Sequence, residues 1–288
     1  METFIKVFNI DKAYNKEYEL WGLGDFHLGA RASNEELIER VVKRIQSNPN
    51  AYWIGTGDYC DCIVMSDQKR FDPKGIAKWI PLEELWEAPF LQTQRACDIL
   101  APIQDRCLGL LEGNHEHELW KRHNQNITAA IAHDFKVPFL GYSTWGLLKW
   151  RWKTGKSATT RKLSLYAHHG YGGGRTTGGK ANKLVHAGMR FHADVTILGH
   201  GHDPILHPVD KPRLVDCGSR KPKFKTSTRI EIASSSFLKT MQEGTTTYSE
   251  KMGYDTVWMG ATYATVIPFA NNPGGGFKVK MGVHGVDV

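Results

Sequence analysis

Short apolar runs recur along the first two thirds of the chain, and each one stops at a glycine or a polar residue. The run Tyr18–Gly24 is mostly apolar, and Ala51–Thr56, Cys107–Leu111, Leu163–Ala167 and Asp194–Leu198 have the same character. Runs of this length, bounded in this way, are typical of buried strands. We therefore predict a strand at each of these five places.

A segment with helical periodicity lies between the first two of these predicted strands. Between Ser33 and Ser47, five apolar residues return on one helical face: Leu37, Ile38, Val41, Val42 and Ile45. Ser33 and Glu36 match a capping box at the start of this helix. The segments Leu85–Leu100 and Glu116–Phe135 are also predicted to be helical. Strands separated by helices indicate βαβ units and a largely parallel core.

The character of the chain changes after Gly199. Prolines punctuate the following segment, Thr-rich β segments come next, and a Gly-rich turn at 271–276 precedes a last short strand. We expect one main domain at 1–225 and an accessory β-rich segment at 226–288, which packs on the core or mediates a homo-oligomer contact. Residues 58–112 include an insertion long enough to form a cap, in which Trp79 and Trp86 line the cap or pack in the core.

Composition and charge narrow the class of protein. The 288 residues are 41% hydrophobic and 23% charged, as in soluble globular proteins. No apolar run approaches the ~20 residues of a membrane span, and the first residues resemble no signal peptide. The five cysteines form no CxxC pair, which favours reduced thiols and a cytoplasmic location. A net charge of +7 favours anionic partners, including nucleic acid and phosphorylated small molecules.

Five polar clusters follow the predicted strands. In chain order they are Asp25-Phe26-His27, Gly57-Asp58-Tyr59-Cys60-Asp61, Gly113-Asn114-His115-Glu116, His168-His169-Gly170 and Gly199-His200-Gly201-His202. Ligands of open α/β sheets bind beyond the carboxyl ends of the strands. We therefore expect these clusters to converge on one rim, although they are far apart in the sequence.

This series resembles the motifs of calcineurin-like metallophosphoesterases, which include protein phosphatases, cyclic-nucleotide phosphodiesterases and Mre11-type nucleases. The resemblance extends from about Glu19 to Asp203, and every motif of the family is present. It implies an α/β fold in four layers, α/β/β/α, with a sandwich of two mixed sheets flanked by helices. We adopt this expectation in place of the parallel core that the alternation alone indicates.

The resemblance also implies a dinuclear metal centre. Two divalent ions can clamp an ester phosphate and activate a bridging hydroxide as the nucleophile. The implied ligands of one ion are Asp25, His27, Asp58 and His202. Asp58 bridges to the second ion, which Asn114, one histidine of the pair His168 and His169, and His200 complete. Imidazole and carboxylate ligands suit Mn²⁺, which we favour, and also Fe, Zn or Ni.

By the same resemblance, His115 is a general acid or charge stabiliser near the leaving group. Glu116 or Asp61 would orient its imidazole, as carboxylates commonly orient active-site histidines, and for Asp61 a hydrogen bond within its own loop is the alternative. Gly170 follows the histidine pair, which favours His169 over His168 as the ligand.

The segment GRTTGGK, from Gly174 to Lys180, matches the G-x-x-x-x-G-K pattern of a phosphate-binding P-loop. Ala181 follows where a P-loop has Ser or Thr, so we interpret the segment as a glycine-rich loop beside the metals. Tyr171, Arg175 and Lys180 in or beside this loop are candidates to bind the non-reacting part of the substrate, and a solvated turn is the alternative.

Two basic stretches bear on the substrate. Lys149–Lys153 alternates cations with two indoles, and Arg220–Lys225 contains four cations and Phe224. Cations interleaved with aromatic rings suit the binding of single-stranded nucleic acid. The alternative is an exposed strand whose charges discourage edge-to-edge pairing. The leading hypothesis is a metal-dependent phosphodiesterase or nuclease. A phosphomonoesterase is the alternative enzyme, and a nucleic-acid-binding module with a residual metal site is an alternative of another class.

Overall fold

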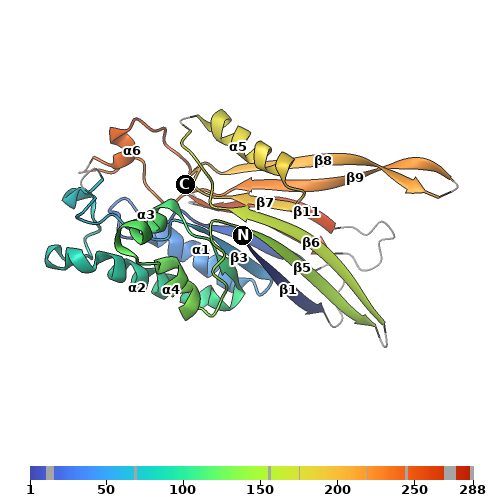
Figure 1. The fold of residues 1–288 in the computed structure, drawn as a ribbon, viewed down its shortest axis with the longest axis horizontal. Coiled ribbons are helices and arrows are strands. Elements are labelled where there is room, and N and C mark those ends of the chain that lie inside the picture. Colours follow the sequence, from blue (N-terminus) through green and yellow to red (C-terminus); the bar gives the residue numbers. More distant parts are fainter. Residues whose placement is uncertain are drawn as a thin grey trace.

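Two mixed β-sheets form the centre of the molecule (Figure 1). The computed structural model describes residues 1–10, 16–67, 70–154, 157–174, 176–218, 220–243, 246–268 and 277–285. In the order of its strands, the first sheet contains β1 (Glu2–Ile10), β5 (Ser143–Thr154), β6 (Ser157–His168), β7 (Val195–Leu198), β9 (Arg220–Ala233) and β8 (Ile205–Cys217). The second contains β11 (Phe277–Gly285), β10 (Gly260–Pro268), β2 (Tyr18–Gly24), β3 (Ala51–Gly57) and β4 (Cys107–Leu110).

Helices cover the outer face of each sheet. On the second sheet lie α1 (Glu35–Ser47), α2 (Ala88–Leu100), α3 (Asn114–His123) and α4 (Ile127–Asp134), and on the first lies α5 (Thr177–Arg190). Shorter helical turns are η1 (Pro73–Gly75), η2 (Leu82–Glu87), η3 (Ala101–Arg106) and α6 (Tyr248–Lys251). Separate apolar clusters fill the space between the sheets and the space under the helices. The expected four-layer sandwich of two mixed sheets flanked by helices is confirmed.

Two helix boundaries, the start of α1 and the end of α3, differ from those predicted from the sequence. The side chain of Asn34, not Ser33, caps α1 by accepting the Leu37 N–H, while the Ser33 hydroxyl donates to the Phe26 carbonyl at 2.7 Å. The helix expected over 116–135 is two helices, because Asn124 adopts a left-handed backbone conformation (φ 56°) that ends α3. In the described residues, no helix has both the length and the apolar character that crossing a bilayer requires.

The C-terminal segment is part of both sheets. The boundary expected between residues 225 and 226 lies within β9, which pairs with β7 and β8 in the first sheet. In the second sheet, β10 lies between β11 and β2. The segment after residue 225 therefore contributes core strands and is not the accessory element predicted from the sequence. Such pairing joins residues more than 200 positions apart, so a local pattern cannot reveal it.

The first basic stretch is a core strand. Trp150 and Trp152 of β5 are 0% and 3% exposed, and Trp150 stacks on Phe8 between the sheets with ring centroids 5.0 Å apart. Their indoles therefore have no surface on which a nucleobase can stack. By contrast, Trp79 and Trp86 in the 58–112 insertion are 36% and 69% exposed, so core packing does not explain them.

Candidate metal centre

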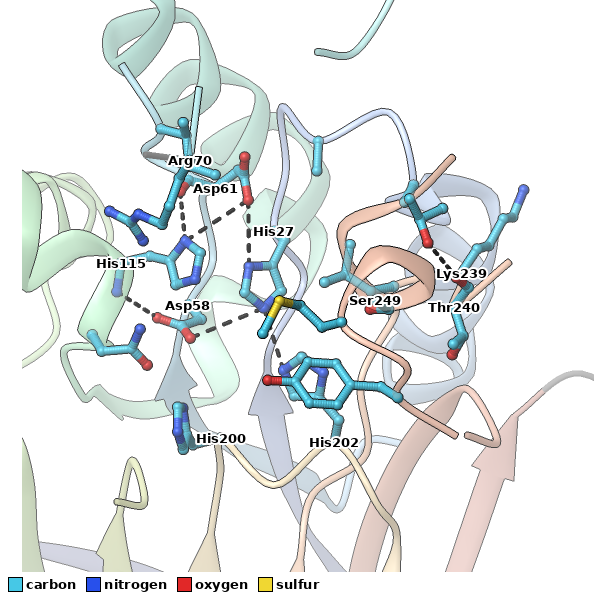
Figure 2. Close-up of a pocket in the computed structure, with 18 of the residues that line it drawn as sticks. His27, Asp58, Asp61, Arg70, His115, His200, His202, Lys239, Thr240 and Ser249 are labelled. Atoms are coloured by element: carbon cyan, nitrogen blue, oxygen red, sulfur yellow. Dashed lines mark hydrogen bonds and ion pairs between the residues drawn. The ribbon is translucent and has the colours of Figure 1, made fainter. Parts of the chain in front are cut away.

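The five polar clusters meet at one rim of the sandwich, as the strand-end rule predicts. The strands β2, β3 and β4 are parallel neighbours in one sheet, and β6 and β7 are parallel neighbours in the other. The loops that follow these five strands carry all the candidate ligands: Asp25 and His27, Asp58, Asn114, His169, and His200 and His202. Figure 2 shows His27, Asp58, His115, His200 and His202 pointing toward one another across this rim.

Strained backbone conformations hold several of these side chains. Asp25, His27, Asp58, His200 and His202 all have φ between 49° and 64°, a region that non-glycine residues rarely adopt. Such conformations persist only where the surroundings impose them. Here the loop after β2 donates its backbone N–H groups to the carbonyls of residues 57–59 in the loop after β3, at 2.8–3.0 Å. These hydrogen bonds between the two loops hold the backbone in the conformation from which the side chains point toward one another (Figure 2).

One group of donors contains Asp25, His27 and His202, whose ligand atoms lie within 4.8 Å of one another. The Nε2 atoms of His27 and His202 are 3.4 Å apart, and His202 Nε2 lies 3.2 Å from Asp25 Oδ1. Within the described residues, the buried Asp25 Oδ1 makes no hydrogen bond, whereas His27 Nδ1 faces the Asp61 carboxylate at 3.7 Å. A buried oxygen without a hydrogen bond is costly, and a cation held by these three residues would satisfy it.

A second group contains Asp58, His169 and His200. His169 Nδ1 lies 2.6 Å from the Thr56 carbonyl, which only accepts, so Nδ1 carries the ring proton. The other ring nitrogen, Nε2, accepts the Asn114 backbone N–H at 3.2 Å and lies 3.5 Å from Asp58 Oδ2 and 3.0 Å from Asn114 Oδ1. An imidazole nitrogen, a carboxylate oxygen and an amide oxygen converge here, and donor atoms of these types suit a divalent cation.

Asp58 connects the two groups. Its Oδ2 lies 4.0 Å from His27 Nε2 and 3.5 Å from His169 Nε2, while its Oδ1 accepts the backbone N–H of His115 at 2.9 Å. The Asp58 side chain is 1% exposed. A carboxylate in this position can contact ions in both groups, as the bridging role expected from the sequence requires.

The protonation states also suit metal binding. Burial alone would raise the pKa of Asp58, but the imidazoles of His169, His115 and His27 outweigh burial and lower that pKa. Burial and the neighbouring His115 lower the pKa of His27, and burial together with His169 lowers the pKa of His200 to about 4. The carboxylate is therefore ionised and these two imidazoles are neutral near pH 7. Metal ions require deprotonated ligands of this kind.

His115 lies beside both groups, with its ring oriented by Asp61. Its Nδ1 donates to the Asp61 backbone carbonyl at 2.6 Å, and the Asp61 carboxylate is 3.7 Å from the same nitrogen. This leaves Nε2 as the ring nitrogen that is free to exchange a proton. His115 also forms a potential ligand group with His27 and Asp58.

Glu116 has a different place from the one considered in the sequence analysis. Its buried carboxyl accepts four backbone N–H groups, from Asp58, Tyr59, Cys60 and Gly113, at 2.6–3.1 Å. It therefore holds the loop that carries Asp58 against the start of α3. Within the described residues, Glu116 makes no hydrogen bond or ion pair with the His115 ring, which is held instead by the backbone carbonyl of Asp61.

The two histidines at the end of β6, His168 and His169, have different environments. His169 is fully buried within the second group, whereas His168 accepts the Gly170 N–H at 2.7 Å and belongs to none of the potential ligand groups of the described residues. The geometry thus favours His169 as the ligand and argues against His168.

The candidate substrate-binding residues lie at the cavity wall. Tyr171 is 45% exposed there, and Lys180 lines the cavity with its ammonium 3.1 Å from the Asp203 carboxylate. Since Lys180 already has an anionic partner, its capacity to attract a phosphate is reduced. Arg175 lies outside the described residues.

A cavity of about 800 Å³ opens over the metal-binding rim. One wall comes from the 58–112 insertion, including Arg70, Phe71 and Leu85, so this insertion does border the site. The opposite wall comes from the segment between Leu238 and Val257, which the sequence analysis did not place near the site. Tertiary folding therefore brings together two walls that are distant in the sequence.

Arg70, Ser234 and Ser236 belong to the site although no sequence motif predicts them. Arg70 lies beside His115 in Figure 2, and its Nε donates to Asp67 at 2.7 Å, which fixes the guanidinium. Ser234 and Ser236 follow the end of β9 and donate to the Oδ2 atom and the backbone carbonyl of Asp25, at 3.4 and 3.1 Å. Because β9 is parallel to β7, the same strand-end rule would have found these serines had β9 been located.

Comparisons with known proteins add little beyond this geometry. No protein-family model matches the chain, and no curated protein matches it significantly. Among solved structures, Vps29 of Entamoeba histolytica complexed with Zn²⁺ aligns over 92% of this chain and 98% of its own, with 12% identity and a TM-score of 0.36. NAD nucleotidase (NadN) of Haemophilus influenzae aligns over 95% of this chain and 51% of its own, with 9% identity and a TM-score of 0.40. Because these TM-scores are low, the functional conclusion rests on the site itself.

Proposed function

We propose that this chain hydrolyses phosphate esters with two divalent metal ions, and that phosphodiesters are its preferred substrates. The observation that supports hydrolysis most directly is the convergence of buried, deprotonated ligands around Asp58. Histidine nitrogens and carboxylate oxygens lie within 4.8 Å of one another there, and the buried Asp25 Oδ1 has no hydrogen bond within the described residues. Such a donor set fits first-row divalent metals, of which we favour Mn²⁺.

The ligands divide between two ions that share Asp58. Asp25, His27 and His202 would hold one ion, while Asn114, His169 and His200 would hold the other. When bound, the ions would polarise the phosphoryl oxygens and lower the pKa of water. The Thr56 carbonyl orients His169, and Ser234 supports Asp25, so these neighbours hold the donors in their binding orientation.

Two further side chains would act on the ester itself. His115, fixed through Nδ1 by Asp61, would pass a proton from Nε2 to the leaving oxygen. Arg70 would hold a non-bridging phosphate oxygen with the outer nitrogens of its guanidinium, because its Nε is engaged by Asp67. Both residues line the cavity.

The size and walls of the cavity favour a diester. A volume of about 800 Å³ exceeds what one terminal phosphate requires and leaves room for a group on each side of the phosphorus. The second wall, at 238–257, would contact one of the two ester groups on the phosphorus, either the leaving group or the group that stays bonded to it.

The test compares bis-p-nitrophenyl phosphate with p-nitrophenyl phosphate in the presence of Mn²⁺. We expect turnover of the diester to exceed that of the monoester and to fall sharply in Asp58→Asn and His115→Ala, while elemental analysis shows metal loss in Asp58→Asn but not in His115→Ala. Faster monoester turnover would replace the proposal with a phosphomonoesterase. Metal binding without turnover of either ester would favour a nucleic-acid-binding module with a residual metal site.

A further inference from the structure

The hairpin of β8 and β9 extends beyond its sheet (Figure 1). The strand β7 pairs with β9 at Ile230–Ala233. Among the described strands, the part of β9 from Arg220 to Arg229 pairs with β8 alone. This portion is therefore a two-stranded ribbon, an arrangement that is marginally stable in water by itself.

The register of this ribbon places its cations on one face. Residues directly opposite each other share a face, and successive residues alternate between faces. The opposed pairs on one face are Val209 with Arg229, Lys211 with Ser227, Arg213 with Lys225, and Val215 with Lys223. From Val209 to Val215 and from Lys223 to Arg229, this basic face carries five cations, Lys211, Arg213, Lys223, Lys225 and Arg229, and no carboxylate, and the next pair toward the sheet is His207 with Glu231.

Only the cations near the base of the ribbon contact the protein body. Lys211 donates to the Gly188 carbonyl at 2.7 Å, and Arg229 lies 2.9 Å from His192 Nδ1. Farther out, Arg213, Lys223 and Lys225 are exposed, and none of them has a hydrogen bond or ion pair with any residue that the structure describes. Their charges are therefore open to a partner.

This arrangement does not serve the stability of the hairpin. Arg213 and Lys225 are directly opposite each other, and like charges in such a pair repel. Alternating charges would protect a strand edge equally well without that repulsion. The concentration of one sign on one face points to a partner with a regular array of negative charges.

We propose that the basic face of the β8–β9 ribbon binds the phosphate backbone of nucleic acid without sequence preference. Lys223 and Lys225 are two residues apart, a rise of about 6.8 Å along a strand, which matches about two phosphates at ~3.4 Å per nucleotide. The basic face offers no Asn or Gln side chain to read base edges. Phe224, 79% exposed on the opposite face, provides a surface on which an unpaired base can stack.

The ribbon would anchor a polymer whose scissile phosphate lies in the metal centre. The strand β8 begins at Ile205, three residues after His202, so the arm and the site are joined by a short connection. The catalytic consequence rests on the proposed phosphodiester hydrolysis, whereas binding by the ribbon does not depend on it. The two are therefore tested separately.

The test is binding of fluorescent oligonucleotides of random sequence, single-stranded and duplex, at increasing salt in EDTA. In Lys223→Gln with Lys225→Gln, the slope of log affinity against log salt should fall by about 1.4 for single strands or about 1.8 for duplex, with at least roughly tenfold weaker binding at low salt. Lys223→Arg with Lys225→Arg should bind as the parent protein does.

The matched control is Arg40→Gln with Lys43→Gln, which removes the same charge from exposed positions of α1 on the other outer layer. It should leave the salt slope unchanged. An unchanged slope in the ribbon variant, an equal loss in the control, or binding to anionic lipid vesicles in preference to oligonucleotides would each overturn the proposal. Turnover of bis-p-nitrophenyl phosphate should be the same in the parent and ribbon variants, so failure of the catalytic proposal is recognised independently.

Discussion

Replacement of Glu116 by glutamine should destabilise the protein, although the two side chains have nearly the same shape. Each carboxyl oxygen of Glu116 accepts two backbone N–H groups: Oε1 from Tyr59 and Cys60, and Oε2 from Asp58 and Gly113. Glutamine has one oxygen and one NH₂ group. Whichever way the amide turns, its NH₂ faces two buried donors.

The magnitude follows from those two orphaned donors. A buried donor without an acceptor costs about 1–3 kcal/mol, so we expect a loss of about 2–6 kcal/mol in the free energy of unfolding. Unfolding entropy of about 2.1 cal/mol/K per residue gives about 0.6 kcal/mol/K for 288 residues. A loss of about 4 kcal/mol therefore lowers Tm by about 7 °C.

Burial and the Asp58 carboxylate raise the pKa of Glu116 to about 8, which by itself favours a neutral carboxyl at pH 7. A neutral carboxyl, however, would direct its own O–H toward backbone donors. The four accepted N–H groups therefore favour the ionised form, and the glutamine variant distinguishes the two states.

The assay is thermal unfolding in EDTA, so that differences in bound metal do not contribute. Glu118→Gln is the control on the same helix, because Glu118 is 36% exposed and its partners Lys121 and Arg122 are solvated. We expect the control to stay within about 0.5 kcal/mol of the parent protein. A Glu116→Gln variant that melts with the parent would refute the reasoning and show that the carboxyl is neutral.

Three other predictions concern the metal ligands, the phosphate contact and the core. His169→Ala should reduce the metal content measured by elemental analysis, whereas His168→Ala should not, and the reverse would assign the ligand to His168. Arg70→Lys keeps the charge but loses the planar fork, so KM for bis-p-nitrophenyl phosphate should rise roughly tenfold with metal content unchanged; an unchanged KM would remove Arg70 from the substrate site. Trp152→Ala should cost about 3–5 kcal/mol in chemical denaturation through the cavity it leaves, with oligonucleotide affinity unchanged. Weaker binding at full stability would instead support a stacking role for this indole.

Local patterns predicted much of the scaffold around the site. The strand Tyr18–Gly24 agrees with its predicted bounds, and α1 differs only at its first turn, because burial of one face leaves a direct trace in the sequence. The N-terminal strand β1 was not predicted, since its charged residues Glu2 and Lys6 interrupt the apolar pattern. The two-sheet arrangement came from the family resemblance, because pairing between distant strands has no local signal.

The sequence by itself determined which chemical groups can reach the rim. Parallel neighbours in one sheet end on the same side, so Asp25 after β2 and Asp58 after β3 meet there, whereas His200 follows β7 of the other sheet and joins them through the packing of the two sheets. Only the tertiary structure decided their protonation and orientation. The tautomer of His169 depends on the Thr56 carbonyl, 113 residues away, and the place of Glu116 depends on the turn that follows β3.

The same distinction separates the two basic stretches, which look alike as sequence. In β5 the tryptophans turn inward between two sheets, and in β9 Phe224 projects from a ribbon that has no second sheet beneath it. Alternation along a strand determines which residues share a face. Which face is buried, and whether anything covers it, depends on strands and helices from elsewhere in the chain, and therefore on the folded molecule.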